Sequence, residues 1–161
     1  AVIVGVYSAY TDRTYARASV WPRVELNFHL STNEQSSEFG VKMSNSGIGP
    51  AIIKTVQMEV GGKYLKTWKD VLAFIGEFPQ DIHLSTSNMA NIVLPAEQTT
   101  TTFHIKASDK SMSNKVMDTL RTVNISVCYC SVYDECWLKV RKSEPKKVEQ
   151  CVVNSDNDFK N

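Results

Sequence analysis

Apolar and polar residues alternate along several stretches of the chain, a pattern that predicts half-buried β-strands. In residues 24–30, for example, Val24, Leu26 and Phe28 fall on one face, while Glu25 and Asn27 fall on the other. Residues 51–60 are rich in β-branched side chains and end at Gly61-Gly62, a two-residue turn signal. Strand character is expected in residues 24–30, 39–43, 51–60, 81–107 and 123–140.

The spacing of apolar residues changes in the middle of the chain. Within residues 63–78, Leu65, Trp68, Leu72 and Ile75 recur at intervals of three and four, which predicts a helix ending near Gly76. Trp68 lies in this apolar stripe, so a core position is expected for it rather than a ligand-stacking one. The polar segment 108–122 is interpreted as a loop or a short helix around Val116 to Leu120.

The first ten residues are almost wholly apolar and precede a polar stretch that contains Arg13 and Arg17. Ten apolar residues are too few to cross a bilayer, which needs about 20. We expect them to be the end of a longer hydrophobic helix, with Tyr7, Tyr10, Tyr15 and Trp21 suited to the lipid–water interface. The alternative is a helix packed on its own domain or on a second copy of the chain. The residues expected to contact membrane or a second copy are Val2, Ile3, Val4, Val6, Tyr7 and Tyr10.

Composition fits one folded domain with short appendages. Apolar residues make up 42% of the 161 residues and charged residues 22%, and the net charge is +1. This balance gives no overall attraction to nucleic acid. The basic stretch 139–147 is interpreted as a solvated strand end and loop. The predicted divisions are a hydrophobic helix over 1–22, a β-domain over 23–151 and a polar tail over 152–161.

A glycine-rich segment, NSGIGPA at residues 45–51, lies between two predicted strands. A dinucleotide-binding G-x-G-x-x-G would need a glycine where Ile52 stands, followed by a helix, and no P-loop pattern is present. Glycine tolerates positive φ, and proline fixes its own φ while keeping the preceding residue extended. The segment is therefore predicted to be a strand-to-strand turn, formed by Asn45, Gly47, Gly49 and Pro50.

The cysteines gather at the C-terminal end, around a predicted hairpin in residues 123–140. If this hairpin folds symmetrically about Tyr133, Cys130 faces Cys136 and an aromatic pair, Tyr129 and Trp137, faces across the strands. Four cysteines allow three connectivities, of which Cys130–Cys136 with Cys128–Cys151 is favoured. The alternatives are a structural zinc site, a redox-active dithiol and unpaired buried thiols.

No enzyme signature is present. The chain has no G-x-S-x-G stretch, and His29, His83 and His104 lack the H-x-x-x-H or H-x-H spacing of metal ligands. Asp81 and His83 would share a strand face, but no nucleophile accompanies them. We therefore expect neither catalytic residues nor a cofactor or metal.

In combination, WPRVELNF, NSGIGPAIIKTVQMEVGGK and CYCSVYDECW resemble a group of uncharacterised bacterial proteins. In that group a single N-terminal transmembrane helix carries a small extracytoplasmic domain, and N-x-G-x-G-P-A and C-x5-C-W motifs recur. The segments MSNSGIGPA and VLPAEQTTTTFHI are also similar to the corners of immunoglobulin-like adhesion modules. The resemblance implies a location and a fold, and it brings no catalytic residues.

Together these observations predict a mainly β protein, an antiparallel immunoglobulin-like sandwich with an N-terminal helix and one inserted helix. The expected function is that of a non-catalytic, membrane-tethered module that binds another protein of the cell envelope. We expect it to be anchored in the inner membrane with its domain in the periplasm, and to form a homo-oligomer through residues 1–20 if the helix packs on a second copy. The alternatives are a small-ligand or metal-binding sensor domain, using His83, His104 or the cysteines, and an enzyme with an unrecognised site.

Overall fold

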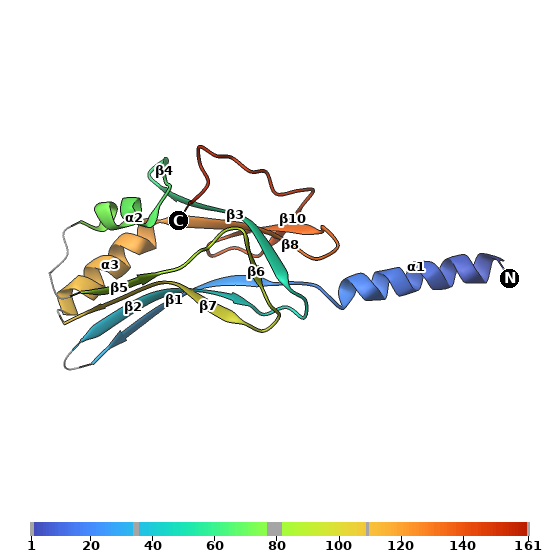
Figure 1. Ribbon diagram of the computed structural model, residues 1–161, viewed down its shortest axis with the longest axis horizontal. Helices are drawn as coiled ribbons and strands as arrows, with labels where there is room; N and C mark the ends of the chain where they lie inside the picture. Colours follow the sequence, from blue (N-terminus) through green and yellow to red (C-terminus); the bar gives the residue numbers. More distant parts are fainter. Residues whose placement is uncertain (1, 34–35, 77–81, 109, 161) are drawn as a thin grey trace.

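The computed structural model describes residues 2–33, 36–76, 82–108 and 110–160 (Figure 1). Within these residues the protein is mainly β, with ten strands in two antiparallel sheets and three helices. The mainly β class expected from the alternating pattern is therefore confirmed. One helix, α1 (Val2–Ala18), projects from the β-body along the long axis of the molecule.

The first sheet has the strand order β1-β2-β7-β5. Its central pairing places Phe39 of β2 opposite Ile105 of β7, and β1 runs antiparallel to β2 along its whole length. Side chains alternate between the two faces of a strand, so Phe39, Val41 and Met43 of β2 all point into the core and are buried. The strands are β1 (Val24–Thr32), β2 (Ser37–Asn45), β5 (His83–Thr86) and β7 (Thr99–Ala107).

The second sheet has the order β10-β9-β8-β3-β4, and β6 pairs with the beginning of β3. β8 and β9 form the hairpin expected from the sequence, with Cys130 opposite Cys136 and Tyr129 opposite Trp137. The two aromatic rings are stacked, with centroids 5.8 Å apart. The strands are β3 (Ala51–Val60), β4 (Lys63–Leu65), β6 (Ile92–Leu94), β8 (Asn124–Cys130), β9 (Cys136–Val140) and β10 (Lys146–Val148).

The core lies between the sheets and is closed at one end by two helices. The Trp68 ring stacks on Phe103 with centroids 5.0 Å apart, and the Phe159 ring contacts Trp68 edge-on, also with centroids 5.0 Å apart. Trp68 is 7% exposed, so the core position predicted for it is confirmed.

Helix α2 (Trp68–Ile75) begins at a capping box. The Thr67 side chain accepts a hydrogen bond from the Asp70 backbone, and the Asp70 carboxylate accepts one from the Thr67 backbone. The helix ends at Gly76, as expected. The prediction of helix from residue 63 was wrong, because Gly61 and Gly62 take positive φ and turn the chain back, so that Lys63–Leu65 pairs with β3. Residues 77 and 78 lie outside the described residues.

Helix α3 (Lys110–Thr122) is longer than the short helix considered around Val116 to Leu120. The expectation of one inserted helix was wrong, because α3 is a second inserted helix. Val116 and Leu120, one turn apart, are buried against the sheets and stabilise it. Arg141 of the β9–β10 loop donates hydrogen bonds to the Leu120 and Val123 carbonyls at its C-terminal end.

The segment after the last cysteine returns to the β-body. The Phe159 side chain is buried in the core, and its backbone N–H donates to the Val56 carbonyl at 2.7 Å. Asp158 accepts a hydrogen bond from the Gln57 side chain at 2.9 Å. The segment predicted as a polar tail is therefore held against β3 by these contacts.

Candidate functional site

The first half of α1 displays apolar side chains without covering them. Ile3 is 85% exposed, Val4 72% and Tyr7 73%, and Val6 and Tyr10 are exposed to a similar degree. Ile3, Val6, Tyr7 and Tyr10 recur at intervals of three and four, so they lie along one side of α1, and the β-body does not cover them. The side chain of Val2 lies outside the described residues. An uncovered apolar stripe of this kind indicates contact with a membrane or with another protein chain.

The length of α1 limits what it can do alone. None of the helices within residues 2–33, 36–76, 82–108 and 110–160 is long and apolar enough to cross a membrane. Membrane contact by residues 2–10 thus stays a prediction.

The second half of α1 borders a hollow of about 560 Å³ at its junction with the β-body. Arg13 and Arg17, one turn apart, contribute two guanidinium groups, and Glu135 approaches from the tip of the β8–β9 hairpin. Sequence reasoning missed this cluster, although the spacing of Arg13 and Arg17 was a usable signal. The lining residues are Tyr10, Arg13, Thr14, Arg17, Ala18, Trp21 and Glu135.

The charged side chains in this hollow differ in whether they have an ion-pair partner. Neither Arg13 nor Arg17 forms an ion pair within the described part of the chain, and the Arg17 Nε atom is buried without a hydrogen-bond partner. Glu135, by contrast, pairs with Lys147 at 3.1 Å. The hollow therefore presents two unpaired cations next to an acid that already has its counter-charge.

The segment that joins α1 to β1 is held by Asn45, at the end of β2. Its side-chain oxygen accepts hydrogen bonds from the backbone N–H groups of Arg23 and Gly47, each at 3.0 Å. Its amide donates to the carbonyl of Gly49 at 2.8 Å and to that of Leu94 at 3.1 Å. Asn45 is 1% exposed, so one buried side chain ties the helix junction, the glycine turn and β6 together.

Gly47 and Gly49 lie directly under the same segment. A Cβ atom on Gly47 would lie 2.3 Å from the Trp21 carbonyl oxygen, and one on Gly49 would lie 2.0 Å from that of Val20. Neither glycine adopts positive φ, so conformational freedom does not explain their presence. Their role is to allow close backbone approach, and the turn with Pro50 joins β2 of one sheet to β3 of the other.

A network of charges links the two sheets near this junction. The Lys139 ammonium contacts the Glu25 carboxylate at 2.8 Å, and Arg23 bridges Glu25 at 3.0 Å and Glu144 at 2.7 Å. Burial raises the pKa of Glu25, but the hydrogen bonds and charges of Lys139 and Arg23 outweigh it and lower the pKa overall. The interpretation of Lys139 as part of a solvated stretch was wrong, because its side chain is only 9% exposed.

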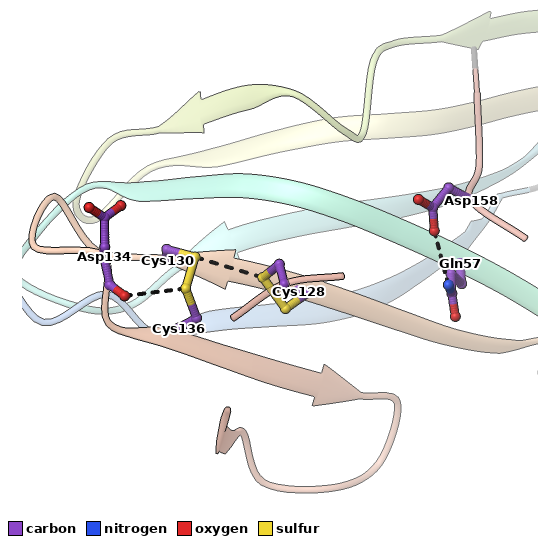
Figure 2. The surroundings of a disulfide bond; sticks show 7 residues. Gln57, Cys128, Cys130, Asp134, Cys136 and Asp158 are labelled. Carbon is purple, nitrogen blue, oxygen red and sulfur yellow. Dashed lines mark hydrogen bonds between the residues drawn. A yellow bond between two sulfur atoms is a disulfide. The ribbon is translucent and has the colours of Figure 1, made fainter. Parts of the chain in front are cut away.

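The four cysteines form two disulfides, Cys128–Cys151 and Cys130–Cys136, which is the pairing favoured from the sequence (Figure 2). The Cys130–Cys136 bond crosses the β8–β9 hairpin, whereas Cys128–Cys151 ties the C-terminal segment to the sheet. The Sγ atoms of Cys130 and Cys151 are 3.7 Å apart, so the two disulfides touch. The cysteines described by the structure include no free thiol.

The other candidate ligands are dispersed. The Sγ atoms of Cys130, Cys136 and Cys151 lie within 4.8 Å of one another, but all three are oxidised to disulfides and offer no thiolate to a metal. His29 and His83 are exposed, and His104 lies 3.6 Å from Glu38 on the first sheet. Asp81, considered with His83, lies outside the described residues.

Comparison with known proteins gives no relative: no family model matches the chain, and no curated protein or solved structure matches it significantly.

Proposed function

We propose that this protein is a non-catalytic module, tethered to a membrane by α1, whose β-domain binds another protein of the cell envelope. The tether would place the domain on the extracytoplasmic side, at a bacterial inner membrane. The observation that carries the proposal is the exposed apolar stripe along the first half of α1, a helix that projects away from the β-body (Figure 1).

The dimensions of α1 support insertion of its first half. Residues 2–10 at about 1.5 Å per residue extend roughly 13 Å, close to half of a hydrocarbon core about 30 Å thick. Tyr10, Tyr15 and Trp21 then follow where amphipathic rings are enriched, at the membrane–water interface. The β-body would begin just above the headgroups.

The two disulfides support an exported location. Disulfides persist in oxidising compartments such as the bacterial periplasm and are rare in the cytosol. Here they close both the β8–β9 hairpin and the C-terminal segment.

The strand order supports an immunoglobulin-like topology for the β-domain. In constant-type immunoglobulin domains, one sheet has the order A-B-E-D and the other C-F-G. The corresponding orders here are β1-β2-β7-β5 and β3-β8-β9, with α2 and α3 inserted. This agrees with the resemblance of the sequence to extracytoplasmic immunoglobulin-like domains.

The edge strand β5 is the surface that suits a protein partner best. All four of its residues, His83–Thr86, are exposed, and its only pairing within the described chain is with β7. A free edge accepts an added strand through main-chain hydrogen bonds.

A metal-binding sensor is the second candidate, and the proximity of three cysteine sulfur atoms favours it. It requires reduction of both disulfides, because only thiolates ligate zinc. Zinc binding by the reduced chain, measured with a chromophoric chelator, tests it.

Flotation with phosphatidylcholine vesicles tests the tether. The 161-residue chain should float with the vesicles, and the triple variant Ile3→Asp/Val4→Asp/Val6→Asp should stay in the dense fraction. The matched control is Val152→Asp/Val153→Asp, which changes two valines that are 69% and 72% exposed on the C-terminal segment. Equal flotation of all three proteins, or of none, would refute the tether.

A further inference from the structure

We propose that the hollow between α1 and the β8–β9 hairpin binds the phosphate group of an anionic phospholipid, through Arg13 and Arg17. This inference rests on the proposed membrane tether and adds a lipid class to it. The ligand chemistry follows from the two guanidinium groups, because arginine binds phosphate through paired N–H donors.

The side chains around the hollow have the spacing of one helix face. Tyr10, Arg13, Thr14 and Arg17 recur at intervals of three and four, so they stack along a single side of α1. Trp21 continues this side beyond the end of the helix and is 49% exposed. The face offers two cations, the Tyr10 hydroxyl group and the rings of Tyr10 and Trp21, which fits a phosphate with its glycerol attached. The Thr14 hydroxyl already donates to the Tyr10 carbonyl at 2.9 Å.

Charge in the hollow favours an anion. Arg13 and Arg17 are free of ion pairs within the part of the chain that the structure describes, and the Arg17 Nε lacks any hydrogen-bond partner although it is buried. A buried donor without a partner costs free energy that an incoming acceptor recovers. The one acid in the hollow, Glu135, is paired with Lys147 at 3.1 Å. Asp12, the acidic residue of α1, is not among the lining residues.

The position of the hollow along the membrane normal also matches that of a lipid headgroup. If residues 2–10 fill one leaflet, Arg13 lies about 4–5 Å beyond Tyr10 along the helix, at the level of the phosphates. Arg17 lies one turn further out, and its long side chain can reach back toward that level. A helix that inserts from this end therefore brings the hollow to the lipid phosphates without further adjustment.

Vesicle binding with and without anionic lipid tests this site. The full chain is titrated with vesicles of pure phosphatidylcholine and with vesicles containing 30 mol% phosphatidylglycerol. A basic residue near an anionic surface contributes about fivefold in affinity, so Arg13→Gln/Arg17→Gln should lose roughly 25-fold on the mixed vesicles. Its binding to pure phosphatidylcholine, which has a phosphate but no net charge, should change much less. Failure of the unmodified chain to bind either vesicle would refute the tether, whereas equal binding of both by all variants would refute the site alone.

Two further variants separate a lipid site from general charge attraction. Lys63→Gln/Lys69→Gln removes the same charge from exposed positions in β4 and α2, two elements distant from α1 (Figure 1), and should retain full preference for phosphatidylglycerol. Arg13→Lys/Arg17→Lys keeps the charge but loses the paired donors, and should lose affinity severalfold. Wild-type affinity in the lysine variant, or an equal loss in the control variant, would overturn the site.

Free phosphate and a second copy of the chain are distinguished in the same experiment. Millimolar glycerol phosphate should not compete with mixed vesicles, because the tether raises the effective concentration of the lipid phosphate. Full competition would mean a site for a soluble phosphate. A change in sedimentation of the lipid-free chain on Arg13→Gln/Arg17→Gln would mean that the hollow is a contact between copies, and either result would overturn the proposal.

Discussion

The side-chain oxygen of Asn45 lies 3.0 Å from the backbone nitrogen of Arg23 and accepts its hydrogen bond. This contact joins the end of β2 to the residue just before β1, which is also the point where α1 leaves the β-body. The same side chain holds the glycine turn and the end of β6. Asn45 therefore helps to hold the segment from which the projecting helix leaves the β-body.

Asn45→Ala should be among the most destabilising single changes in the chain. It leaves several buried backbone groups without a partner, each of which costs about 1–3 kcal/mol, so a loss of about 3 kcal/mol is expected. Urea unfolding measures this directly. Asn27→Ala is the control, since its exposed amide donates to the Ser44 hydroxyl at 3.1 Å, and it should change the free energy of unfolding by under about 0.5 kcal/mol. Similar losses in both variants would contradict the role assigned to Asn45.

Gly47→Ala and Gly49→Ala should each disturb the junction, because the new Cβ atom would overlap backbone atoms of residues 20–23. Backbone cannot move aside as a flexible side chain does, so we expect a loss of about 2 kcal/mol or more and a shift in Trp21 fluorescence. Gly5→Ala is the matched control, since nothing lies within 4 Å of its Cβ position and alanine favours helix. An unchanged Gly49→Ala protein would show that close approach does not explain these glycines.

The strands could be predicted because alternation is a local signal, as in Phe39, Val41 and Met43 of β2. The length of helix α3 was harder to predict from the sequence. It depends on the packing of Val116 and Leu120 against strands that are distant in the sequence. The requirement for glycine at positions 47 and 49 could not be predicted either. Residues 20–23 approach these glycines only in the tertiary structure.

The candidate site could also be predicted only in part from the sequence. The apolar stretch at the start of α1 is visible in the sequence, and the symmetric hairpin placed Cys130 opposite Cys136, as the structure has them. The hollow was not predicted, because it forms only when the tip of the β8–β9 hairpin brings Glu135 beside Arg13 and Arg17.

Removing the disulfides one at a time should have unequal effects. In the loop-entropy account, a bond closing 23 residues contributes about 3.4 kcal/mol and one closing 6 residues about 2.2 kcal/mol. Cys128→Ser/Cys151→Ser should therefore be destabilised about 1 kcal/mol more than Cys130→Ser/Cys136→Ser in denaturant unfolding. The reverse order would show that packing of the hairpin, and not loop length, governs their contribution.

Stability should fall in acid, partly through Glu25. Its pKa in the folded protein is below the ordinary value of 4.5, since Lys139 and Arg23 together outweigh the effect of burial. A carboxyl group of this kind stabilises fully above its unfolded pKa, and the stabilisation is lost as pH falls through the lower folded pKa. Glu25→Gln should be less stable at pH 7 and show a shallower loss between about pH 5 and pH 3.

The control for this pH dependence is Glu144→Gln, which removes an exposed ion pair with Arg23. Exposed pairs contribute about 0–1 kcal/mol, so its profile should stay close to that of the unmodified chain. If Glu25→Gln and the unmodified chain lose stability in parallel as pH falls, Glu25 is not a source of the acid sensitivity.

Quenching of Trp21 fluorescence by vesicles that carry brominated lipids tests the membrane tether most directly. Trp68 and Trp137 are buried at 7% and 8% exposure, which leaves Trp21 as the tryptophan accessible to lipid. Lipids brominated near the headgroup should quench a fraction of the emission, lipids brominated deep in the chain should quench less, and Trp21→Phe should abolish the effect. Emission unchanged by either lipid, with Trp21 in place, would contradict the account.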